Sequence, residues 1–84
     1  MIAQQNTNTL YRQVVAVTAD YLGPASERFI DRQIQTHLHK QPDQLRKEDI
    51  AKLANWIEIV VALLTEDDET VRNFTRDLRR LGRS

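Results

Sequence analysis

Residues 49–64, DIAKLANWIEIVVALL, form the stretch that decides the fold. Their apolar side chains recur at three- and four-residue steps, which is the spacing of an α-helix, and they divide into two groups. The second group lies about 100° further round the helix than the first. An apolar arc this wide indicates a helix that is covered on two sides. The first face is Ile50, Leu53, Ile57, Val60 and Leu64, and the second is Trp56, Ile59 and Leu63.

Helical periodicity continues on both sides of this stretch, so the sequence predicts an all-α protein, a compact bundle of four helices. Gly23-Pro24 separates the first two helices, because glycine suits a helix end and proline suits a helix start. Thr65 followed by carboxylates is a start signal for the last helix. Residues 1–8 are predicted to be a flexible lead-in, and 9–84 a single domain. The predicted helices cover about residues 9–22, 24–40, 46–64 and 66–81.

The composition narrows the classes of protein that the chain can belong to. Cysteine is absent, and 12 acidic residues balance 12 basic ones. Disulfides and thiolate metal sites are therefore excluded, and no net charge draws the chain to nucleic acid or an anionic membrane. The N-terminus lacks the basic start and apolar stretch of a signal peptide, and no apolar run approaches the ~18 residues of a membrane span. We expect a soluble, cytoplasmic protein that binds no cofactor, no metal and no membrane.

The residue types that carry most enzyme chemistry are scarce or poorly spaced. Two glycines cannot build a glycine-rich phosphate loop, and neither Ser26 nor Ser84 has a histidine at an activating spacing. His37 and His39 stand two residues apart, so on a helix they point apart and cannot hold one metal ion. We interpret them as helix-end residues favoured by the helix dipole, in preference to phosphotransfer histidines. The chain is predicted not to be an enzyme.

The second face of residues 49–64 has two possible roles. It is ordinary core if the first helix covers it, or it meets another protein. The first helix also has two apolar faces, and apolar surface in excess of what the helices can cover marks a binding site or an oligomer interface. Aromatic residues are enriched at interface centres. The candidate interface, for a second copy in a homodimer or for another protein, is Trp56, Ile59, Leu63, Tyr11 and Val15.

A stripe of arginines on the last predicted helix supports an alternative function, a nucleic-acid or phosphate-binding domain. Four of them are separated by four, three and four residues, and the fifth lies beside them. However, arginines late in a helix also complement its dipole, and the spacing allows Asp68 to pair with Arg72 and Asp77 with Arg80. Without a clustered basic excess, nucleic acid is not the expected partner. The candidate anion-binding residues are Arg72, Arg76, Arg79, Arg80 and Arg83.

Residues 20–81 also resemble a known module. The matching positions are Tyr21-Leu22-Gly23-Pro24-Ala25, Phe29-Ile30, Leu45, Asp49-Ile50 and Leu53-Ala54. This pattern resembles a small uncharacterised helical module at the C-terminal end of some bacterial, notably cyanobacterial, signalling proteins such as response regulators and serine/threonine kinases. This chain departs from that setting because it shows no receiver or kinase domain. The resemblance implies a non-enzymatic interaction or dimerisation module with a regulatory or assembly role in bacterial signalling, whose partner is itself or another signalling protein.

Overall fold

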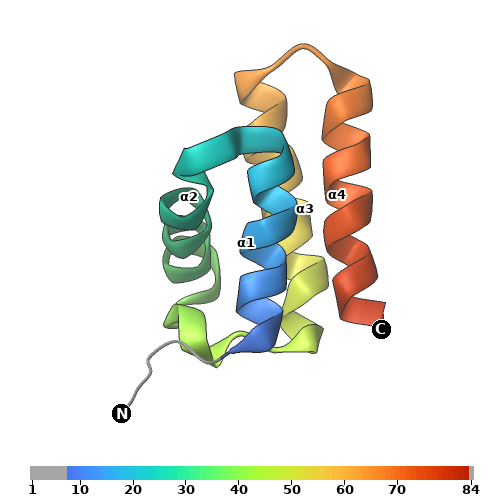
Figure 1. The fold of residues 1–84 in the computed structure, drawn as a ribbon. Helices are drawn as coiled ribbons and strands as arrows, with labels where there is room; N and C mark the ends of the chain where they lie inside the picture. Colours follow the sequence, from blue (N-terminus) through green and yellow to red (C-terminus); the bar gives the residue numbers. More distant parts are fainter. Residues whose placement is uncertain (1–7, 84) are drawn as a thin grey trace.

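The computed structural model describes residues 8–83, and every regular element among them is helical. Four α-helices alternate in direction, so that each lies antiparallel to the next (Figure 1). The predicted all-α, compact fold is confirmed. Within these residues, no helix is both long and apolar enough to cross a membrane. The helices are α1 (Thr9–Leu22), α2 (Ser26–Gln33), α3 (Lys47–Leu64) and α4 (Asp68–Arg83).

The prediction of four separate helices requires a correction, because residues 9–38 form one continuous, bent helical segment. A 3₁₀ turn, η1 (Gly23–Ala25), joins α1 to α2, and a π-helical turn, η2 (Ile34–Leu38), extends α2. Gly23 makes the bend with φ 69° and ψ −143°, a backbone region that is almost restricted to glycine. Three helical segments therefore build the fold, and the second predicted helix ends at residue 38 rather than 40.

α1 begins at Thr9, as predicted, and Asn8 directly before it is held by hydrogen bonds. The Oδ1 atom of Asn8 accepts the N–H of Tyr11 at 2.9 Å, which caps the helix. The Nδ2 atom of Asn8 donates to the carbonyl of Leu45 at 2.9 Å and so ties α1 to the loop before α3. Asn8 is therefore part of the folded domain, and the rest of the predicted lead-in lies outside the described residues.

The start of α4 uses a different cap from the predicted one. Asp67 accepts the N–H of Thr70 at 3.2 Å and its hydroxyl at 2.7 Å. These hydrogen bonds, that from the Thr70 hydroxyl above all, hold the pKa of Asp67 below its ordinary value. Thr65 contributes by accepting the N–H of Asp67 at 3.1 Å, so the helix begins at residue 68 instead of 66.

The core lies between α1 and its neighbours. α1 packs against α2 and α4, and α3 packs along α4 and against η2, as the arrangement in Figure 1 shows. The ring of Tyr21 stacks on that of Phe74, with centroids 4.8 Å apart, and this contact joins α1 to α4. Each helix buries most of the apolar stripe that its spacing predicts. The apolar residues with no exposed surface are Val14, Ile30, Ile34, Ala54, Ile57 and Phe74.

Candidate protein-interaction surface

One side of α3 carries four large apolar side chains that the fold does not bury. Because α3 packs on α4 and η2, it buries Ile50, Leu53 and Ile57 of its first predicted face, and beside them Ala54 and Val61. The second face stays at the surface. We call the following set the apolar face of α3: Trp56, Ile59, Leu63 and Leu64, which are 38%, 53%, 82% and 69% exposed.

Leu64 was expected in the core, and its exposure has a simple structural cause. It is the last residue of α3, and the chain then turns through residues 65–67 before α4 begins. The spacing of apolar residues predicts which side of the helix a side chain lies on, but not whether another helix extends far enough along the axis to cover it. Leu64 therefore enlarges the exposed surface instead of the core.

Trp56 has a role in the fold as well as at the surface. Its ring stacks almost parallel on the half-buried ring of His37, with centroids 4.2 Å apart and planes 8° apart. The π-helical turn η2 brings His37 to this position, and a π-helical turn cannot be read from apolar spacing. The contact attaches the end of the bent helical segment to α3. Trp56 is thus part core and part surface, whereas Leu63 is almost wholly surface.

Tyr11 is a core residue, contrary to its predicted place in an interface. It is 5% exposed, and its hydroxyl donates to the Oδ1 atom of Asp31 at 2.5 Å. Burial, and then this hydrogen bond, raise the pKa of Tyr11 well above its ordinary value. Val15 is half-buried against the same core, on a helix that packs on α2 and α4. The burial of Tyr11 therefore contradicts its predicted place in an interface, whereas the interface role of Val15 stays a prediction.

The arginine stripe of α4 is largely engaged within the protein. The Nη2 atom of Arg79 donates to Glu58 and to Asn55, both at 2.9 Å. Asp77 lies 3.6 Å from Arg76 and 3.9 Å from Arg80. Acidic partners thus offset the positive charge of three of the five candidate anion-binding residues. All of the five except Arg79 are exposed, and Arg83 lines a groove between the start of α3 and the end of α4 that also contains Glu48.

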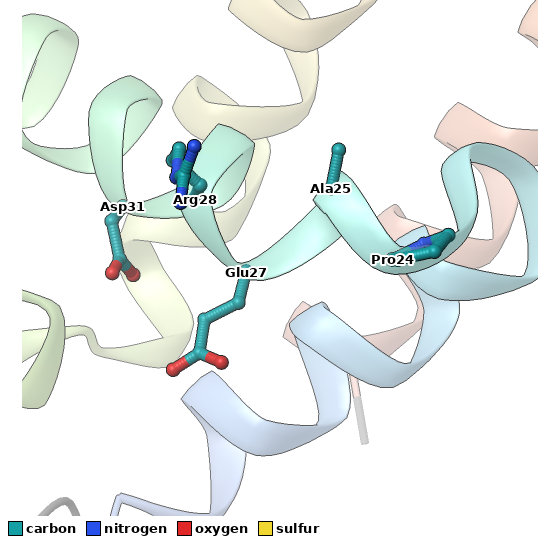
Figure 2. A pocket seen from close by; sticks show the side chains of 5 residues that line it. All are labelled: Pro24, Ala25, Glu27, Arg28 and Asp31. Carbon is teal, nitrogen blue, oxygen red and sulfur yellow. The ribbon is translucent and has the colours of Figure 1, made fainter.

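An open hollow runs along η1 and α2, and Figure 2 shows its five lining residues. The carboxylates of Glu27 and Asp31 point to the same side of α2, while Arg28 points away from them (Figure 2). Asp31 already accepts the hydroxyl of Tyr11. The lining holds no serine, threonine, lysine or histidine, and one of its two carboxylates serves the fold. The residues are Pro24, Ala25, Glu27, Arg28 and Asp31.

Comparison with known proteins leaves the apolar face of α3 without a precedent. No family model matches the chain, and no curated protein or solved structure shows significant similarity to it. The resemblance to the bacterial signalling module therefore stays a prediction. In the described part of the chain, residues 8–83, no group of three or more histidine, aspartate or glutamate side chains is arranged to hold a metal ion.

Proposed function

We propose that the chain is a non-enzymatic protein–protein interaction module that binds its partner through the apolar face of α3. The observation that carries this proposal is the exposure of four large apolar side chains on one helix of a domain whose core is otherwise closed. Single exposed apolar residues are normal on protein surfaces, but contiguous apolar patches mark binding sites. A regulatory or assembly role in bacterial signalling follows from the resemblance of residues 20–81 alone.

The composition of the face fits a protein partner. Leu63 and Leu64 supply flexible aliphatic surface, and Trp56 supplies a rigid aromatic ring that its stack on His37 holds in place. A fixed aromatic ring loses little conformational entropy on binding, and tryptophan is enriched among the residues that dominate interface energies. Burial would contribute roughly 25 cal/mol per Å² before the costs of association. A complementary apolar helix or groove is the kind of partner surface that this face suits.

The geometry favours this function over binding to nucleic acid or phosphate. The alternative needs arginines that are available to phosphates, yet Arg79 is held by Glu58 and Asn55. Asp77 is shared between two further arginines of the stripe. The balance of acidic and basic residues also removes the long-range attraction that non-specific binding to a polyanion requires.

Affinity capture from a lysate of the native host tests the proposal. The baits are the wild-type protein, the variant Leu63→Glu, and the control Ala16→Glu, which introduces the same charge at an exposed apolar position of α1. We expect the wild type and Ala16→Glu to retain the same protein, and Leu63→Glu to lose it. Circular dichroism of each bait checks that the helical content is unchanged.

Two results would contradict the proposal. In the first, no retained protein depends on Leu63, so that Leu63→Glu and Ala16→Glu capture the same set. In the second, an RNase- and salt-sensitive nucleic acid is retained by the wild type and lost on substitution of Arg72 and Arg83, two exposed arginines of the α4 stripe that form no ion pair within residues 8–83. The second result would establish the alternative function.

A further inference from the structure

We infer that the occupant of the apolar face of α3 is a second copy of this chain, bound antiparallel so that the two α3 helices cross near Ile59. This inference rests on the proposed function and names the partner. It follows from the charges at the two ends of the face. A surface that is apolar in the middle and oppositely charged at its ends is complementary to itself after a two-fold rotation.

The C-terminal end of the face is strongly acidic. Residues 65–69, which follow α3 directly, hold four acidic side chains and no basic one. Glu66, Asp68 and Glu69 are exposed, and within residues 8–83 none of the three forms an ion pair. The negative end of the α3 dipole lies beside Glu66, while Asp68 and Glu69 stand at the positive end of the α4 dipole, so Glu66 is the acidic residue least compensated by the fold. This end therefore favours a basic group on the partner.

The N-terminal end of the face has the opposite character. Asp49 is paired with Lys40 at 2.6 Å, and Glu48 lies 3.7 Å from Arg46, so both acidic residues near this end already have a cation. Lys52 lies one helical turn before Trp56 on the same side of α3, is exposed, and forms no ion pair among the described residues. The positive end of the helix dipole is also here.

An antiparallel crossing at Ile59 brings these ends together. Lys52 stands seven residues, about 10 Å along the helix axis, before Ile59, and α3 ends at Leu64, five residues or about 8 Å after it. Lys52 of one copy therefore faces the acidic turn that follows α3 in the other, where Glu66 lies two residues beyond the helix end, and this pairing occurs twice in the dimer. Trp56 precedes Ile59 by three residues and Leu63 follows it by four, so the Trp56 ring of one copy meets Leu63 of the other. A parallel pairing would instead place like charges opposite each other at both ends.

The exposed area is adequate for a weak, reversible dimer. The four side chains of the face expose roughly 500 Å² in one copy, so two copies would bury about 1,000 Å², near the lower limit of specific interfaces. We therefore expect a monomer–dimer equilibrium with a dissociation constant on the order of 10 µM. With such an equilibrium, a change in the concentration of the protein alters the fraction that is dimeric.

Charge reversal tests the partner and its orientation in one experiment. Sedimentation equilibrium on the full chain compares the wild type with Lys52→Glu, Glu66→Lys and the double variant. Each single variant places like charges opposite each other twice, and we expect its dimer to weaken about tenfold or more. The double variant restores both attractions and should dimerise as the wild type does. An equimolar mixture of the two single variants should form a heterodimer, because both charge pairs are then attractive.

The controls separate the charge pairing from general effects. Arg28→Glu reverses a charge of the same sign on α2, outside the face, and should leave the dimer unchanged. Since Lys52 and Glu66 are exposed, their reversal should not unfold the domain, and circular dichroism checks this. If either variant loses helical signal, the neutral pair Lys52→Ala and Glu66→Gln replaces it, with a weaker dimer expected for each.

Three results would overturn the inference. They are a wild-type protein that remains monomeric up to millimolar concentration, single variants that dimerise as tightly as the wild type, and a double variant that fails to recover. A monomer that still captures a host protein through Leu63 would overturn the second copy as partner and leave the proposed function standing. A monomer whose face captures nothing would overturn both.

Discussion

The substitution Leu63→Ala should separate the stability of the fold from association. Leu63 is 82% exposed, so the fold covers about a fifth of it. Complete burial of a leucine side chain is worth about 1.5–3 kcal/mol, so this fifth contributes roughly 0.3–0.6 kcal/mol to the free energy of unfolding. Ile57, six positions earlier on the same helix, is fully buried, and Ile57→Ala should cost about 2–5 kcal/mol.

The effect of Leu63→Ala on association should be much larger. The substitution removes three carbon atoms, worth about 0.8 kcal/mol each when buried, and a two-fold dimer loses them twice. Since an interface buries the side chain partly or fully, the dimer should lose about 2–4 kcal/mol, which corresponds to a dissociation constant roughly 30- to 1,000-fold higher. Leu63→Ala should therefore leave the fold nearly intact while it abolishes measurable self-association at micromolar concentration.

Urea denaturation followed by circular dichroism measures the first effect, and sedimentation equilibrium measures the second. The denaturation is done at low micromolar protein, where association adds nothing to the free energy of unfolding. A loss above about 2 kcal/mol in Leu63→Ala would refute the reasoning, because Leu63 would then be packed inside the folded unit. Unchanged self-association in a variant that remains folded would refute the assigned surface.

Further expectations concern two backbone positions with positive φ, and the hydroxyls of Tyr11 and Tyr21, which donate to Asp31 and to Asp77. Gly23→Ala should cost about 1–3 kcal/mol of unfolding free energy, since nothing lies within 4 Å of its Cβ and only backbone strain is added. His39→Gly should stabilise the fold by up to about 1 kcal/mol, because His39 has φ 56°. Folding raises the pKa values of Tyr11 and Tyr21, so both hydroxyls contribute fully to the free energy of unfolding below about pH 10, and this contribution is lost as the pH rises further. A variant with both tyrosines replaced by phenylalanine should lose less stability over the same pH range. Urea denaturation measures all three, and an unchanged midpoint in either backbone variant would contradict its prediction.

The sequence predicted those features of the fold that depend on local signals. The first helix has the predicted bounds of 9–22, because apolar spacing defines its body and Gly23-Pro24 defines its end. α3 begins one residue later than predicted and ends as predicted, at Leu64. The all-α class follows from the same periodicity. These features depend on residues close together in the sequence, so one sequence is sufficient to predict them.

The candidate site was only partly predictable, because burial depends on which helices become neighbours. Helical spacing placed Trp56, Ile59 and Leu63 on one face, but the sequence left open whether they form core or surface, and the structure exposes all three. Tyr11 has the apolar spacing of an exposed second face, yet α2 covers it and Asp31 satisfies its hydroxyl. The π-helical turn that places His37 on Trp56 has no sequence signal of its own.

The fluorescence of Trp56, the only tryptophan in the sequence, tests most directly whether the apolar face of α3 is covered on association. The emission of the wild type is recorded over a concentration series beside its molar mass from light scattering. We expect the emission maximum to move to shorter wavelength as the mass rises, because the exposed part of the ring leaves water, and to stay constant in Leu63→Glu. An emission maximum that does not change while the mass doubles would contradict this claim, since the protein would then associate through another surface.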